Sequence, residues 1–483
     1  MKINVLAFVA ITIFIFGCSR KQETKVESTK TSSIIVSENG HYLQTSDGKP
    51  FFYLGDTGWE LFHKLDRNEA ELYLENRKQL GFNVIQCVLL PERGPLNSPN
   101  IYGDQPLNSS TGVFLPNTTE GNDFADSVAY DYWDHVDYII NLAEKKGLYV
   151  GLLPCWGDYV TPRFRDLIVY DDTLKGYNYG QYLGNRFKEN KNIIWILGGD
   201  RLPNENYSGL SVWRSMAEGI TDATNGENSQ DGKANYEATC MTYHCFYPSS
   251  IWFENDPWID FHMWGSYHEK RNMDRSFEIP YYQWQLKTMK PTINGEPAYE
   301  LSGINYDPDG KLGFFDDFDV RQQAYWSVFA GAMGHTYGCS LIWMFYKNGI
   351  DTPRESLKGQ NWQTQLTATG AGQMKYLKQL IESKSFFDRV PAQEILAQNR
   401  HDEVGHLQAT KGDNYAMVYI PTGKKVGIVM GKIKGEKVNA KWFNPKNGSY
   451  TNIGTFDNKG ITTFDPPGEE MRGNDWVLEL VGN

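Results

Sequence analysis

Asp200 and Glu296 are the acidic residues whose setting in this sequence best suits chemistry. Each follows a short apolar segment that ends in glycine: Asp200 comes after Ile193-Ile194-Trp195-Ile196-Leu197-Gly198-Gly199, and Glu296 after Thr292-Ile293-Asn294-Gly295. Such a run is typical of a strand that is buried on both faces, and glycine at its end lets backbone or ligand come close. We therefore expect each acid at the C-terminal tip of a buried strand.

Two carboxyl groups that face each other can hydrolyse a glycosidic bond. One must be protonated, to give its proton to the leaving oxygen, and the other must be ionised, to attack or stabilise the cationic sugar. In the retaining reaction the two groups lie about 5–5.5 Å apart. We predict Asp200 as the acid/base, with its pKa raised by apolar neighbours and by the second charge, and Glu296 as the nucleophile.

Other interpretations of these acids stay open. Asp200 could cap the segment that follows it, and Glu296 could pair with an arginine of the fold. Glu92 and Glu300 also lie near predicted strand ends and are reserve candidates.

The elements that must bring the two acids together alternate between strand and helix. The apolar patterns predict helices over 67–80, 131–146, 177–188, 210–223, 280–289, 320–333 and 372–382. They predict strands over 51–56, 82–90, 148–154, 193–197, 237–244, 259–264, 290–296 and 339–345. Eight alternating strands predict an α/β fold, a (β/α)8 TIM barrel over residues 38–384, whose chemistry gathers at the C-terminal strand ends.

The sequence changes character after residue 385. Helical periodicity stops, and short alternating strands are predicted over 415–420, 426–430, 438–443 and 476–480, separated by turns rich in glycine, asparagine and proline. This pattern predicts a C-terminal antiparallel β-sandwich accessory domain over residues 385–483.

Aromatic and polar residues follow the predicted strands, where they would form one rim of the barrel. Aromatic faces stack on sugars, and carboxylates and imidazoles bond sugar hydroxyls. Trp59 and Trp343 could instead cap the barrel, and His244 could be a buried structural histidine. The candidate substrate-binding residues are Asp56, Trp59, Trp156, Asp158, Tyr243, His244, His268 and Trp343.

The charge and composition of the chain limit the kinds of molecule that it is expected to bind. The net charge of −12 lacks the basic footprint that nucleic acid needs, so we expect no nucleic-acid partner. Aromatic residues make up 14% of the chain, which suits both an aromatic core and sugar stacking. We expect an oligo- or polysaccharide substrate, no cofactor, no metal and a monomeric protein.

The N-terminus has the pattern of a bacterial lipoprotein signal. Lys2 precedes an apolar run that is too short to span a bilayer and ends at Gly17-Cys18. We predict a signal over 1–18, lipidation of Cys18 and a flexible tether over 19–37. The protein would then be anchored to a membrane at the periplasmic side or cell surface of a Gram-negative bacterium. A cleaved signal with an incidental cysteine is the alternative.

Five further cysteines follow Cys18, and an odd number cannot pair completely. Their spacing is not that of a zinc site, and most lie in apolar runs. We expect core residues, with Cys240 and Cys245 as the one local disulfide candidate.

The order of these motifs is similar to that of a known family. An acid after strand four and a glutamate after strand seven resemble the large clan of retaining glycosidases on this barrel, which usually has Asn-Glu where this chain has Gly199-Asp200. The departure points to the apiosidase-like glycoside hydrolases, family 140. Their pattern is similar to Gly55-Asp56-Thr57-Gly58-Trp59, Trp195-Ile196-Leu197-Gly198-Gly199-Asp200, Thr242-Tyr243-His244 and Asn294-Gly295-Glu296-Pro297-Ala298-Tyr299-Glu300.

The resemblance covers roughly residues 38–483, because Trp442-Phe443-Asn444-Pro445 resembles the sandwich that usually follows such a barrel. It implies release of sugars from plant or algal cell-wall polysaccharide, with apiose in pectin side chains as the known case. Two other functions stay open. One is a non-catalytic, glycan-binding surface lipoprotein, and the other is an adhesion protein in which the sandwich binds a partner.

Overall fold

The computed structural model describes residues 31–108, 115–161, 169–205, 208–270, 273–351, 359–398 and 403–483. The predicted signal, Cys18 and the tether up to residue 30 lie outside these residues. Within them, no helix has both the length and the apolar character needed to cross a bilayer.

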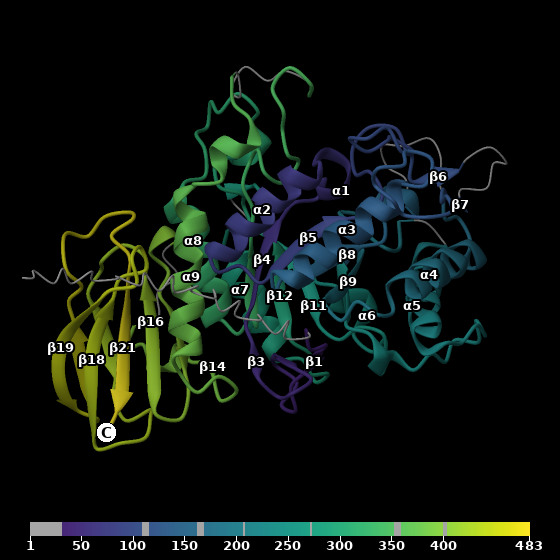
Figure 1. Cartoon of the computed structure of the whole chain (residues 1–483). Helices are drawn as coiled ribbons and strands as arrows, with labels where there is room; N and C mark the ends of the chain where they lie inside the picture. The colour runs from purple at the N-terminus through teal and green to yellow at the C-terminus, as the bar shows by residue number, and fades with distance from the viewer. Residues whose placement is uncertain are drawn as a thin grey trace, which may run out of the picture. The chain divides into compact units, whose positions relative to one another are not determined.

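Eight parallel strands form the central barrel, as predicted (Figure 1). Six of them pair in the order β10-β9-β8-β5-β4-β13, and β11 pairs with β12. Isolated bonds join the two groups: Thr242 donates its hydroxyl to the Phe261 carbonyl at 2.6 Å, and the Met333 N–H donates to the Thr292 carbonyl at 3.0 Å. The strands are β4 (Tyr53–Thr57), β5 (Val84–Val88), β8 (Tyr149–Leu153), β9 (Ile193–Gly198), β10 (Met241–His244), β11 (His262–Gly265), β12 (Thr292–Glu296) and β13 (Gly334–Tyr337).

Helices follow the strands, and aspartate side chains cap the first turns of four of them. Asp66 accepts a hydrogen bond from the Glu69 N–H at 2.8 Å, and Glu69 bonds back to the Asp66 N–H, so Asp66 is the predicted N-cap. Asp131 and Asp316 form the same reciprocal cap. The helices are α1 (Leu61–Lys64), α2 (Arg67–Gln79), α3 (Tyr132–Lys145), α4 (Thr173–Phe187), α5 (Gly209–Asn225), α6 (Ser250–Phe253), α7 (Arg275–Trp284), α8 (Asp317–Phe329) and α9 (Thr369–Glu382).

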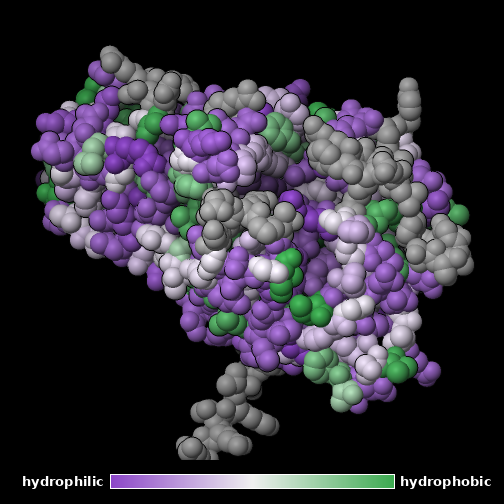
Figure 2. Space-filling view, turned by 90° about the horizontal axis from the view of Figure 1, so that it is seen from above, coloured by the Kyte–Doolittle hydropathy of each residue, from purple (hydrophilic) through white to green (hydrophobic). Residues whose placement is uncertain are grey.

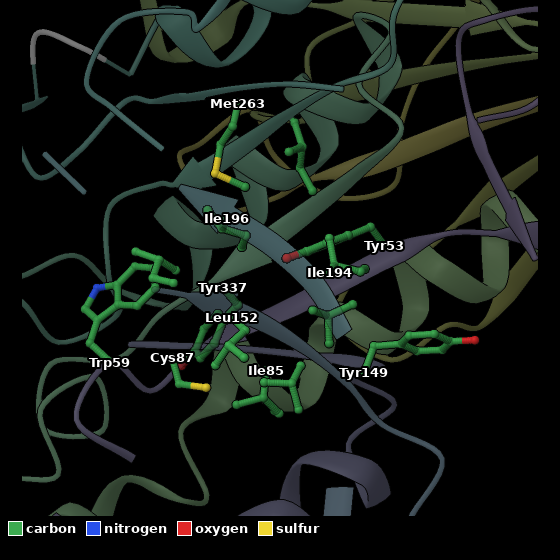
Figure 3. Packing of buried hydrophobic residues seen from close by; sticks show 14 of the residues in the cluster. Tyr53, Trp59, Ile85, Cys87, Tyr149, Leu152, Ile194, Ile196, Met263 and Tyr337 are labelled. Atoms are coloured by element: carbon green, nitrogen blue, oxygen red, sulfur yellow. The ribbon is translucent and has the colours of Figure 1, made fainter. Parts of the chain in front are cut away.

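Bulky side chains such as Tyr53, Ile196 and Met263 lie close together inside the barrel (Figure 3), and glycines of the barrel strands face them. A side chain at Gly151 would meet Ile196 at 2.8 Å and the Tyr53 hydroxyl at 3.1 Å, and one at Gly295 would meet the Met263 sulfur at 2.3 Å. The glycines therefore make room for bulky neighbours, which fill the interior as a packed core.

The eighth strand is not where the apolar pattern predicted it. The strand is β13, while the predicted strand over 339–345 forms turns, with the Ile342 N–H bonded to the Cys339 carbonyl at 3.1 Å. A largely buried apolar run suits a buried loop as well as a strand. The helix predicted over 320–333 is likewise shorter, because α8 ends at Phe329 and Gly331 has a φ of +117°.

Two other elements differ from the sequence prediction. Helix α7 lies over Arg275–Trp284 rather than 280–289, with Pro280 inside it. Strand β1 (Ile34–Val36) pairs with β2 (Leu43–Thr45), which pairs with β3 (Pro50–Phe51), so folded chain begins within the predicted tether. After β5, the long predicted loop holds the short strands β6 (Leu107–Asn108) and β7 (Leu115–Pro116).

The C-terminal region is the predicted antiparallel sandwich. A sheet of order β14-β15-β16-β21-β18-β19 packs against the pair β17-β20 around an apolar core of its own. Arg321 of α8 holds Asp475 of the sandwich through two bonds of 2.7 and 2.8 Å. The strands are β14 (Val390–Pro391), β15 (Gln408–Lys411), β16 (Tyr415–Ile420), β17 (Val426–Val429), β18 (Lys437–Phe443), β19 (Tyr450–Asp457), β20 (Ile461–Phe464) and β21 (Trp476–Gly482).

Candidate active site

The fold brings Asp200 and Glu296 together at the C-terminal ends of β9 and β12. One carboxylate oxygen of each, with one ring nitrogen of His244, all lie within 4.8 Å of one another. The pair therefore shares one mouth of the barrel, as the strand positions predicted. Figure 2 shows the molecule from above, and hydrophilic residues predominate on the face that it shows.

The two acids line a cavity of about 440 Å3. Its walls combine aromatic rings with hydrogen-bonding groups, which is the chemistry of a sugar site. A second cavity, of about 450 Å3, shares four residues with the first, Glu92, Arg93, Trp156 and Asp200, but not Glu296. The other residues of the first cavity include Trp59, Tyr267, His268, Tyr299, Leu301, Tyr306, Phe314, Ser340 and Trp343.

Asp200 is presented by a strained turn at the end of β9. Gly198 and Gly199 have φ angles of +92° and +121°, and Asp200 itself has +56°. A side chain at Gly198 would meet the His244 carbonyl at 2.4 Å, and one at Gly199 would meet the Trp156 ring at 2.8 Å. Only glycines fit this turn, and left-handed non-glycine residues gather at functional sites.

The environment of Asp200 favours its protonated form. Burial and then the charge of Glu296 raise the pKa of the Asp200 carboxyl to about 6, although nearby His244 and a hydrogen bond from the Tyr267 hydroxyl oppose the rise. His244 Nδ1 lies 4.0 Å from Asp200 Oδ1. A carboxyl with this pKa can carry a proton in mildly acidic solution and give it up during a reaction.

The environment of Glu296 favours its ionised form. Burial alone would raise its pKa, but hydrogen bonds and charge from His244 and His268 outweigh burial and lower the pKa to about 2. The Nε2 atoms of these histidines lie 3.3 Å from Oε2 and 3.6 Å from Oε1, respectively. The Tyr299 N–H donates to His268 Nδ1 at 3.2 Å, so in neutral His268 the ring proton sits on Nε2, facing Glu296.

His244 is fixed beneath both carboxyl groups by aromatic neighbours. Its ring centroid lies 5.4 Å from that of Trp59 and 5.7 Å from that of Trp156. The imidazole is buried, so it cannot follow a ligand into solvent. It is a rigid support that contacts the two acids from one side.

Asp200, His244 and Glu296 are also the residues that could hold a metal ion, because each offers one ligand atom to the same space. The opposed pKa shifts of the two acids suit proton transfer better than joint ligation of a cation.

Five of the eight sequence-predicted binding residues line a cavity, and His244 lies buried against Asp200 and Glu296. Trp59, Trp156, His268 and Trp343 line the first cavity. Asp158 lines the second, where it binds Arg201 through bonds of 3.0 and 2.8 Å.

Two predicted binding residues are not brought to the site. Asp56 is buried and accepts hydrogen bonds from Arg77 at 2.7 Å and Tyr73 at 2.5 Å, so it ties α2 to the barrel. Tyr243 is buried, and its hydroxyl donates to the Arg201 carbonyl at 3.1 Å. Both side chains are committed to the fold, which corrects their assignment as substrate contacts.

Of the two reserve acids, Glu92 lies at the cavities and Glu300 does not. Glu92 lines both cavities, and burial together with the charge of Glu60 raises its pKa well above the usual range. Glu300 accepts from the Tyr337 hydroxyl at 2.5 Å and the Gly370 N–H at 3.0 Å, away from the cavities. The cysteines Cys87, Cys155, Cys240, Cys245 and Cys339 are free and buried, so no Cys240–Cys245 disulfide forms.

Sequence reasoning missed Tyr267, Arg93, Arg201 and Tyr306. Tyr267 adopts a φ of +55°, which turns its hydroxyl onto Asp200, and nothing in Gly265-Ser266-Tyr267 announces that conformation. Arg201 directly follows the acid and could have been suspected from that position. Tyr306 precedes Asp307-Pro308-Asp309-Gly310, a turn signature that predicts a hairpin beside the strand end.

Known proteins resemble this chain over most of its length. The family model "Apiosidase-like, catalytic domain" matches residues 37–388, and "Putative collagen-binding domain of a collagenase" matches residues 390–481. A solved structure described as a glycoside hydrolase is 36% identical, with 94% of this chain and 97% of that chain covered and a TM-score of 0.80. A glycoside hydrolase family 5 protein from Bacteroides vulgatus ATCC 8482 is 33% identical, with 93% and 94% covered and a TM-score of 0.80. A comparison with proteins of curated function finds no match.

Proposed function

Since the chain belongs to the apiosidase-like family of glycoside hydrolases, we propose that it cleaves glycosidic bonds with retention of configuration, with Asp200 as acid/base and Glu296 as nucleophile. The observation that carries this proposal is the opposed pair of pKa values, about 6 for Asp200 and about 2 for Glu296. Two carboxyls whose environments push their pKa values apart are suited to different roles.

The spacing supports retention. The nearest oxygens of the two groups lie within 4.8 Å, which is close to the separation of about 5–5.5 Å in retaining enzymes and below the 6.5–9.5 Å of inverting ones. An inverting enzyme needs room for a water molecule between its base and the sugar, and this pair is too close to give it.

The reaction then proceeds in two steps. Glu296 attacks the anomeric carbon while Asp200 gives its proton to the leaving oxygen, which leaves a glycosyl ester on Glu296 and an ionised Asp200. Asp200 next takes a proton from the water that attacks the same carbon, and Glu296 departs as a carboxylate. His244 and His268, which contact Glu296 at 3.3 and 3.6 Å, stabilise that carboxylate between turnovers.

We place the substrate among plant or algal cell-wall polysaccharides, with apiose-containing pectin side chains as the first candidate. The family match and the aromatic walls of the cavity support this class. Lipidation of Cys18 would hold the protein at a membrane facing such polymers. The protein would act as a monomer.

Asp200→Ala and Glu296→Ala test the roles, assayed by chromatography on cell-wall oligosaccharides and on aryl glycosides. Both variants should lose hydrolysis of oligosaccharides, by about 10²-fold or more for the proton donor. Azide, a small anion, should restore turnover of an activated aryl glycoside by taking the place of the missing carboxylate. The glycosyl azide should keep the substrate's configuration with Asp200→Ala and invert it with Glu296→Ala.

Each result decides between functions. Undiminished hydrolysis by Asp200→Ala would refute the acid/base assignment. Wild-type protein that binds oligosaccharides but turns none over would favour the glycan-binding alternative.

A further inference from the structure

A hairpin over residues 301–315 stands beside the catalytic pair. It follows β12, and its arms pair through the Leu301 N–H to the Phe315 carbonyl at 2.8 Å and the Phe315 N–H to the Ser302 carbonyl at 3.0 Å. Asp307 closes its tip by accepting the Leu312 N–H at 3.0 Å. The segment is thus an ordered ribbon attached directly to the strand that carries Glu296.

The hairpin exposes apolar side chains toward the cavity. Tyr306 is 54% exposed and Phe314 44%, and both line the cavity that holds the two catalytic carboxyls. Leu312, on the same hairpin and 60% exposed, is not among the residues that line it. Exposed aromatic rings at the edge of a cleft mark a binding surface.

The position of Tyr306 is fixed by the backbone. The Asn305 N–H donates to the His268 carbonyl at 2.8 Å, and the Asn305 side chain accepts the Lys270 N–H at 2.9 Å. Asn305 and Tyr306 have φ angles of +58° and +61°, a region that non-glycine residues rarely adopt. The Tyr306 ring meets His268 edge-on, with centroids 5.3 Å apart. Strain of this kind persists where the structure holds a residue for function.

The hairpin lies on the side of the sugar that is transferred. Glu296 must touch the anomeric carbon of that sugar, and Tyr306 reaches Glu296 through His268. The second cavity contains Asp200 but not Glu296, so it lies on the side of the leaving group. A chain that fills the first cavity beyond the reacting sugar therefore meets Tyr306 and Phe314.

We propose that the hairpin over residues 301–315 is a distal glycone subsite, in which the rings of Tyr306 and Phe314 stack on a sugar one position beyond the sugar that is cleaved. The proposal rests on the glycosidase function proposed above. The subsite predicts a preference for substrates with at least two sugars on the glycone side, because only the second sugar reaches the rings of Tyr306 and Phe314.

The test uses size-fractionated di-, tri-, tetra- and pentasaccharides from enzymatic digestion of pectin, which spares acid-labile furanosidic bonds, and each fraction is labelled at the reducing end. Wild-type kcat/KM should rise about tenfold when one sugar is added on the glycone side. Tyr306→Ala and Phe314→Ala should each remove most of this gain, chiefly through KM. Tyr306→Phe, which keeps the ring, should retain the gain, and the control Leu312→Ala should behave as wild type.

A pH profile separates stacking from damage to the neighbouring histidine. If Tyr306→Ala acts only by losing its ring, the limbs of its kcat/KM profile stay where they are in the wild type. Equal losses on all fractions, or a wild-type rate that does not depend on glycone length, would overturn the subsite while leaving the proposed hydrolysis intact. Absence of any wild-type turnover would instead count against the glycosidase function itself. In that case the subsite is tested by calorimetry, as binding of the same fractions to Glu296→Gln. Affinity that rises with oligosaccharide length and falls in the Glu296→Gln/Tyr306→Ala double variant would support the subsite. Affinity that depends neither on length nor on Tyr306 would refute it.

Discussion

Removing the hydroxyl of Tyr267 should shift the alkaline limit of activity upward. That hydroxyl donates a hydrogen bond to Asp200 Oδ1, which favours the ionised carboxylate and so lowers the Asp200 pKa. In Tyr267→Phe the ionised form loses this support, while burial and the Glu296 charge continue to favour the proton. The pKa of Asp200 must therefore rise.

The size of the shift follows from the hydrogen bond. A bond to a charged group contributes about 1.5–3 kcal/mol, and one pKa unit is about 1.36 kcal/mol, so the upper range is about 1–2 units. The Asp200 side chain is 30% exposed, so water can replace part of the lost bond. We expect a shift of roughly one unit, from about 6 to about 7.

The assay is kcat/KM measured between about pH 3 and pH 9, since this ratio reports the pKa values of the free enzyme. Wild type should fall off above its Asp200 pKa of about 6, and Tyr267→Phe should hold its activity further toward neutral pH. The matched control is Tyr243→Phe, which removes a hydroxyl that donates to the backbone carbonyl of Arg201 rather than to an acid. This substitution should lower the free energy of unfolding by about 1 kcal/mol and leave the alkaline limb of the kcat/KM profile at the wild-type pH. If the alkaline limb of the kcat/KM profile of Tyr267→Phe stays at the wild-type pH or moves to lower pH, the reasoning is refuted.

Three further outcomes are expected. His268→Phe removes a hydrogen-bond donor that lowers the Glu296 pKa, so the acid limb of kcat/KM should rise from about 2 by roughly one unit; an unchanged limb would show that His244 alone sets it. Asp56→Asn leaves the buried Arg77 unpaired and should destabilise the protein by about 3–5 kcal/mol in denaturant unfolding, with the pH profile of the folded fraction unchanged; a shifted profile would return Asp56 to the site. Cys18→Ser should move the protein from the membrane to the soluble fraction in cell fractionation, and continued membrane association would exclude the lipid anchor.

Much of the fold and site could be predicted because strand ends carry clear signals. The runs before Asp200 and Glu296 are apolar, short and ended by glycine, and parallel strands gather their C-terminal ends by geometry alone. The eighth strand was misplaced because a buried turn over 339–345 is as apolar as a strand.

The remaining errors concern side-chain direction, which the sequence does not reveal. Asp56 also ends a barrel strand, but Arg77 on the next helix captures it. Tyr267 enters the site through a left-handed backbone conformation that its neighbours do not indicate. Strand periodicity states which face a residue takes in regular backbone. It applies to Asp56, which lies within β4, but not to Tyr267, which lies beyond the end of β11.

Each of the two groups of barrel strands carries one of the two acids proposed to be catalytic. Asp200 comes from the six-stranded group and Glu296 from the β11-β12 pair, and among the described residues isolated bonds rather than ladders join the groups. A continuous ladder of hydrogen bonds would set the distance between the two acids by the fixed spacing of paired strands. Where side chains pack between the groups instead, that distance depends on the volume of those side chains. Substitutions that change side-chain volume along these two seams are therefore the ones expected to change the distance between Asp200 and Glu296.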